Sequence, residues 1–90
     1  MKHVNIKVYG RVQRIGFRFT AMQVAYKFGV KGIVQNFDDG SVYMEAEGED
    51  ANVDKFVEWC KVGPLGSKVR NITLEDGEFK NYTAFDITHL

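Results

Sequence analysis

Apolar and polar residues alternate over Lys2–Tyr9, and a period of two residues is typical of a β-strand that is buried on one face. From Phe17 the period changes to the three- and four-residue spacing of one helical face. The residues on this face are Phe17, Ala21, Val24, Ala25 and Phe28. Gly29 ends the predicted helix, since glycine accepts the positive φ of a helix terminus. The first third of the chain therefore predicts a strand, a loop over residues 10–16 and a helix.

The next segment predicts a β-hairpin. We expect strands over Lys31–Asn36 and Ser41–Glu47, with Gly48 ending the second of them. The turn between them contains Asp39-Gly40, and Asp-Gly is typical of tight turns because glycine accepts positive φ.

A second helical stripe follows the hairpin and consists of Val53, Phe56, Val57 and Cys60. We expect Asp50 or Asn52 to cap the start of this helix, because their side chains can accept hydrogen bonds from its first N–H groups. Gly63-Pro64 provides the stop signal at its other end.

Two further strands complete the pattern, over Val69–Leu74 and Thr83–Ile87, with a turn signal at Asp76-Gly77. The order β-α-β-β-α-β is typical of a ferredoxin-like α+β sandwich. Each helix and strand has one apolar face, so the pattern predicts an antiparallel sheet with two helices on one face. No repeat or linker interrupts residues 1–90, which we expect to form one domain.

Composition narrows the setting of this domain. Ninety residues with 44% apolar and 13% aromatic residues are typical of one folded core. The single cysteine, Cys60, has no partner for an internal disulfide, and no metal-ligand spacing is present. The first residues lack the continuous apolar run of a signal peptide, and no apolar stretch is long enough to span a bilayer. We therefore expect a cytoplasmic protein that binds neither a membrane nor a metal. We also expect a monomer without other cofactors, although composition does not determine the oligomeric state.

The net charge of zero conceals an uneven distribution. Residues 1–37 contain seven bases and no acid, whereas residues 38–90 contain all twelve acids and five bases. Three of the four arginines lie within residues 11–18. Such a compact cluster suits a small anion better than a nucleic-acid duplex, which requires an extended basic face. Nucleic acid is therefore not an expected partner.

The junction between the first strand and the first helix is the candidate anion site. The first N–H groups of a helix have no intrahelical partner and carry the positive end of its dipole. Gly16 lacks a Cβ and would let a ligand approach the backbone closely. Arg18 would be unfavourable in a first helical turn unless an anion compensates its charge. On spacing alone, an arginine exposed to solvent explains this position equally well.

Asn36 is the second candidate, because it lies where the second strand meets its turn and its amide could hold a water molecule. Taken alone, a local cap of the turn explains it better. His3 and His89 lie near the termini without an evident nucleophile partner. Cys60 lies on a core stripe. The glutamates at 45, 47 and 49 are expected on a solvated strand face and at the approach to the second helix.

Two segments closely resemble the acylphosphatase family. Residues 10–18, G-R-V-Q-R-I-G-F-R, resemble its signature G-R-V-Q-G-V-G-F-R, and residues 32–42 resemble its second signature, G-W-V-x-N-x-x-D-G-x-V. Both motifs stand in the family's order and spacing, and the similarity extends over almost the whole chain.

The resemblance implies an enzyme that hydrolyses the carboxyl–phosphate bond of small acyl phosphates to a carboxylate and inorganic phosphate. It implies that Arg18 binds the phosphate and that Asn36 orients the attacking water. It also implies a phosphate-binding loop whose members are Gln13, Arg14, Ile15, Gly16 and Phe17. The family is thought to use the substrate's own phosphate oxygen to take the proton from water, so that no histidine or carboxylate base is required.

Two positions depart from the family pattern. Arg14 replaces a glycine inside the loop, and a non-glycine residue would be strained there if the position requires positive φ. Ile33 replaces a tryptophan at a position that we interpret as packing. An alternative hypothesis is therefore an anion-binding module of the same fold that has lost turnover through Arg14. An RNA-binding module of RRM type is disfavoured, because Val69–Leu74 lacks the aromatic residues that stack on bases.

Overall fold

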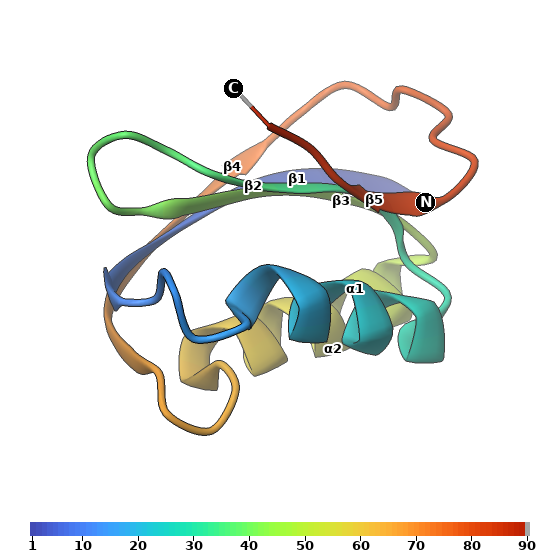
Figure 1. The fold of residues 1–90 in the computed structure, drawn as a ribbon. Helices are drawn as coiled ribbons and strands as arrows, with labels where there is room; N and C mark the ends of the chain where they lie inside the picture. Colours follow the sequence, from blue (N-terminus) through green and yellow to red (C-terminus); the bar gives the residue numbers. More distant parts are fainter. Residues whose placement is uncertain (90) are drawn as a thin grey trace.

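The computed structural model describes residues 1–89. Its elements are β1 (Lys2–Arg11), α1 (Phe17–Phe28), β2 (Lys31–Asn36), β3 (Val42–Gly48), α2 (Asp50–Val62), β4 (Lys68–Asp76) and β5 (Phe85–Ile87). Both helices lie on one face of a five-stranded sheet (Figure 1). The ferredoxin-like α+β class predicted from the sequence is therefore confirmed.

The strands lie in the order β4-β1-β3-β2-β5. The pairs β1–β4, β1–β3 and β2–β3 are antiparallel, in agreement with the predicted antiparallel sheet, but β5 runs parallel to β2, which the prediction did not include. The reason is that Asp76-Gly77 begins no tight hairpin. The chain instead crosses the sheet over residues 77–84, on the face away from the helices, and enters the opposite edge (Figure 1).

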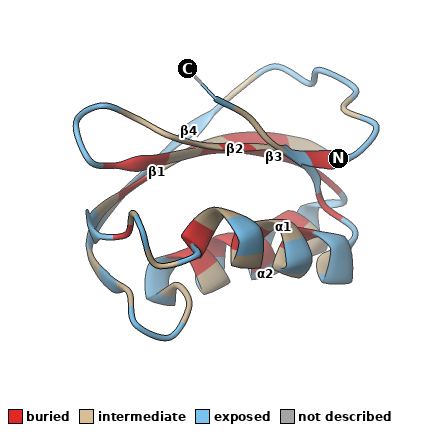
Figure 2. Ribbon diagram, in the orientation of Figure 1, coloured by how far each residue is buried: buried red, intermediate tan, exposed pale blue. Residues whose placement is uncertain are grey.

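The core lies between the sheet and the two helices (Figure 2). It contains the predicted helical stripes and the inward residues of the strands, among them Val4, Ile6, Val8, Phe17, Ala21, Ala25, Val34, Met44, Val53, Phe56 and Cys60. Burial of each large apolar side chain stabilises the fold by roughly 1.5–3 kcal/mol. Cys60 is completely buried, and this burial raises the pKa of its thiol.

The bounds of β1, β3, β4 and β5 differ from the predicted ranges by one or two residues at an end. β1 continues to Arg11, because a bulge at Gly10 keeps the strand paired with β4. A Cβ at Gly10 would meet the carbonyl oxygen of Lys68, so only glycine fits there. The cap expected from Asp50 or Asn52 is absent within residues 1–89, since the N-cap residue of α2 is Glu49 and no side chain caps it.

The prediction of a solvated face is correct for Glu49 and wrong for Glu45 and Glu47, which are buried. The segment 77–84 covers them on the outer face of the sheet. Glu47 accepts hydrogen bonds from the N–H groups of Lys80 (2.9 Å) and Tyr82 (2.7 Å). Its Oε1 also lies 2.6 Å from His3 Nδ1. Glu47 therefore anchors the segment that leads to β5.

Glu45 completes this buried polar cluster. It accepts hydrogen bonds from the hydroxyls of Tyr43 and Tyr82, each at 2.8 Å, and its Oε1 lies 2.8 Å from the ammonium of Lys80. Burial alone would raise the pKa of both glutamates, but the surrounding donors outweigh it, and each pKa lies below its usual value. The cluster thus holds two ionised carboxylates beneath residues 77–84.

No helix within residues 1–89 is long and apolar enough to cross a membrane.

Candidate active site

The loop between β1 and α1 has two residues in the left-handed region. Arg14 has φ 63°, and Gly16, the N-cap of α1, has φ 77°. The side chain of Gln13 anchors this loop, because its amide donates to the carbonyl oxygens of Phe37 and Ser41, each at 2.8 Å. The loop is thereby tied to the turn that follows β2, which ends at Asn36.

A pocket of about 450 Å³ lies where this loop meets the end of β2. It is lined by five of the predicted site residues, namely Arg14, Gly16, Phe17, Arg18 and Asn36. The other two do not line it: Gln13 makes the hydrogen bonds just described, and Ile15 packs against the core. None of the described residues that line the pocket is acidic, and two of them are arginines.

The N-terminus of α1 opens into this pocket. Within residues 1–89 no side chain caps it, and its first turn contains no acid. The first N–H that bonds back into the helix is that of Thr20, which donates to Gly16 at 3.0 Å, so the N–H groups just before it remain available. A Cβ at Gly16 would meet nothing within 4 Å. The backbone is therefore open to an anion, which the helix dipole favours.

Asn36 has an unusual environment for a polar side chain. Its Oδ1 is buried and finds no hydrogen-bond partner in the part of the chain that the structure describes. It does not cap the turn; Asp39 does, by accepting the N–H of Ser41 at 2.9 Å. A buried carbonyl without a partner costs roughly 1–3 kcal/mol, so a donor from water or from a ligand would stabilise it.

The turn after β2 also contains an acid with a shifted pKa, Asp39, but its side chain binds residues that do not line the pocket. Hydrogen bonds from Ser41, together with the ammonium of Lys7 at 3.0 Å, keep the pKa of Asp39 at about 2. Asp39 is thus an ionised structural group of the turn. It does not offer a general base for the pocket.

Four further residues line the pocket that sequence reasoning did not assign to it, namely Val12, Phe19, Ile87 and His89. Phe19 lies outside the predicted apolar stripe of α1. A large apolar residue outside that stripe was the sequence signal that could have pointed to it. Ile87 and His89 reach the pocket only because β5 lies parallel beside β2, which the sequence pattern did not predict. The fold and pocket define a ferredoxin-like α+β protein with a pocket at the N-terminus of its first helix.

Comparisons with known proteins agree with this class. The acylphosphatase family model matches residues 4–87. An acylphosphatase of Lactiplantibacillus plantarum is 43% identical over 90 residues, covering 99% of this chain and 100% of that protein. An acylphosphatase of Archaeoglobus fulgidus is 40% identical over 86 residues, covering 96% and 97%. The crystal structure of an acylphosphatase from Bacillus subtilis matches with a TM-score of 0.94 at 37% identity, covering 98% of this chain and 99% of that chain.

The chain therefore belongs to the acylphosphatase family. It is an enzyme that hydrolyses acyl phosphates. The resemblance seen in the two sequence motifs is confirmed over nearly the whole length of the chain.

Proposed function

We propose that the pocket between α1 and the end of β2 is the active site for this hydrolysis. The observation that carries the proposal is the buried Oδ1 of Asn36, which has no hydrogen-bond partner among residues 1–89 and lines the same pocket as Arg18 at the start of α1. A phosphoryl group held by Arg18 and by the N–H groups at the start of α1 would leave room for a water beside Asn36.

The roles follow from the chemistry of each group. The Arg18 guanidinium and the backbone N–H groups of residues 14–18 stabilise the phosphoryl oxygens, and Gly16 gives them an unobstructed approach. Asn36 accepts a hydrogen bond from the water and orients its oxygen toward phosphorus. Gln13 positions the loop relative to Asn36, and Phe17 and Ile15 fix it against the core.

In the reaction, the water oxygen forms a bond to phosphorus while the bond from phosphorus to the acyl oxygen breaks. The carboxylate leaves with the electron pair, and a phosphate oxygen of the substrate takes the proton from water. A carboxylate is a good leaving group, so positioning and electrostatic stabilisation suffice without a histidine or acidic base.

The test separates binding from turnover in two variants. Arg18→Ala loses hydrolysis of benzoyl phosphate by about a hundredfold or more, and competitive inhibition by phosphate also disappears. Asn36→Ala loses turnover but still binds phosphate, because its partner is the water. Asn71→Ala, on the exposed face of β4, is the matched control and keeps both. Wild-type turnover in a folded Arg18→Ala variant would remove Arg18 from the site.

The setting expected from the sequence belongs to the same proposal. Residues 1–90 act as one cytoplasmic domain, as a monomer, on small acyl phosphates, without nucleic acid, membrane or metal. The buried, reduced Cys60 and the positive groups already present in the pocket support this setting. Binding of phosphate without hydrolysis of benzoyl phosphate would instead favour a non-catalytic anion-binding module.

A further inference from the structure

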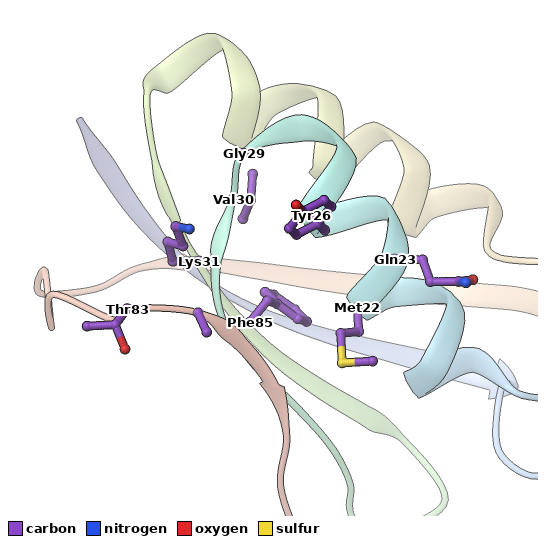
Figure 3. Close-up of a pocket in the computed structure, with 9 residues that line it drawn as sticks. Met22, Gln23, Tyr26, Gly29, Val30, Lys31, Thr83 and Phe85 are labelled. Atoms are coloured by element: carbon purple, nitrogen blue, oxygen red, sulfur yellow. The ribbon is translucent and has the colours of Figure 1, made fainter.

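A second pocket, of about 660 Å³, lies between the C-terminal half of α1 and β5 (Figure 3). Phe85 extends from β5 toward α1, and Met22 extends from α1 toward the sheet (Figure 3). The lining is mainly apolar, and none of the described residues that form it is acidic.

The walls of this pocket continue those of the active-site pocket. Phe19 lines the active-site pocket and Met22 lines the second one, and these residues are neighbours on one helical face because they are three positions apart. On the facing strand, Ile87 lines the first pocket and Phe85 the second, and residues two apart share one face of a strand. The same helix and strand thus join the two pockets.

The helix side of this path carries three large side chains, two of which are exposed. Phe19, Met22 and Tyr26 recur at i, i+3 and i+7, a stripe beside the buried one. Phe19 is 55% exposed and Tyr26 is 86% exposed, whereas Met22 is half-buried against the core. Isolated exposed apolar residues are ordinary, but this line begins at the active-site pocket and ends in a second cavity.

We propose that the path from Phe19 to Tyr26 holds the hydrocarbon chain of medium-chain acyl phosphates. This inference rests on the proposed function, because it requires the phosphoryl group at Arg18. A phosphoryl group there would have the polar groups of the loop and Asn36 on its inner side, so the acyl chain leaves past Phe19 and Ile87. It then lies along Met22 and Phe85 toward Tyr26. The far end of the pocket is at the exposed Lys31, where a longer chain would emerge into water.

The first experiment measures kcat/KM for acetyl, butanoyl, octanoyl, decanoyl and dodecanoyl phosphate below their micelle concentrations. Each methylene that enters the path should raise kcat/KM by roughly two- to fourfold, with a plateau once the chain reaches the exposed end. A series that is flat, while acetyl phosphate is hydrolysed, overturns the inference and leaves the proposed function intact.

Failure to hydrolyse even acetyl phosphate would instead contradict the proposed function. Binding of decylphosphonate, compared with methylphosphonate, then decides the inference without turnover. Decylphosphonate should bind at least tenfold more tightly and shift the NMR signals of Met22 and Tyr26. Equal affinities would overturn the inference.

Variants of the exposed residue Tyr26 separate a role in chain binding from a role in folding. Tyr26→Ser should lower the ratio of decanoyl to acetyl kcat/KM by about threefold or more, since it removes a ring from the path. Tyr26→Phe should restore the ratio. Leu65→Ser is the matched control, because Leu65 is fully exposed and lines neither pocket. Equal ratios in Tyr26→Ser and Leu65→Ser would overturn the inference.

Discussion

Arg14 has a left-handed conformation, φ 63°, at the position where the sequence departs from the family's glycine. This conformation costs a residue with a side chain roughly 1–2 kcal/mol, while glycine adds about 0.5–1 kcal/mol of entropy to the unfolded chain. We therefore expect Arg14→Gly to raise the free energy of unfolding by about 0.5–1 kcal/mol. Urea unfolding of both proteins measures the change.

The natural control is Asn81, which has φ 58° and belongs to a residue type that tolerates this region. Asn81→Gly should therefore gain less stability than Arg14→Gly. An Arg14→Gly variant less stable than the parent would contradict strain at this position. The same variant also loses a cation in the pocket, so the KM for acyl phosphates should rise, most strongly at low salt where screening is weakest.

At the scale of elements, the segment over residues 77–84 depends on ionised carboxylates. The pKa of Glu47 is lowered in the folded protein from a reference value of 4.5, so its contribution is complete above that value and is lost as the pH falls below it. Glu47→Gln should therefore destabilise the protein by roughly 1–3 kcal/mol at pH 7 and much less at pH 3. Urea midpoints between pH 3 and 7 test this difference.

Glu49→Gln is the matched control, because Glu49 is exposed two residues further along the chain. It should leave the midpoint nearly unchanged across the same range. Hydrogen exchange should also accelerate in residues 77–84 of the Glu47→Gln variant. If the difference between Glu47→Gln and the parent were equal at pH 3 and pH 7, ionisation of Glu47 would not anchor the segment.

The elements differ in how far the sequence predicted them. α1 and β2 have the predicted bounds, because apolar periodicity and Gly29 specify them locally. The burial of Glu45 and Glu47 was not predictable, since a period of two residues separates two faces without indicating whether a later segment covers the polar one. That cover comes from residues 77–84, which have no periodicity. The same missing information concealed the parallel placement of β5.

The proposed site shows the same division between local and distant determinants. Gly16 and Arg18 follow from a local strand–loop–helix pattern, and Asn36 follows from its place at the end of a strand. Ile87 and His89 complete the pocket from β5 and the residues just after it, whose position depends on pairing between distant segments, and Phe19 completes it from α1. Family motifs therefore identified the polar groups of the pocket but not the apolar side chains of Phe19 and Ile87.

For the whole molecule, we expect activity to withstand both metal chelation and thiol alkylation. In the proposed mechanism, arginine and backbone N–H groups meet the phosphoryl charge, so EDTA should not change kcat. Cys60 is buried, and its raised pKa disfavours the reactive thiolate, so iodoacetamide should not modify the folded protein. Loss of turnover in EDTA that one divalent ion restores would contradict this mechanism.

The parallel strand β5 also bears on the order of events during folding. It closes a long loop, as the hydrogen bond from Thr88 to Gln35 joins residues 53 positions apart. Contacts so distant in sequence incur a large loop-closure entropy and tend to form late.

Trp59, the only tryptophan, packs against Phe17 and Phe56, so its fluorescence reports on the packing of the two helices against each other. Upon refolding, its fluorescence should therefore recover before hydrolysis does; simultaneous recovery would argue against late docking. If β5 docks late, the enzyme has a nearly complete core for some time before its active-site pocket has a complete wall.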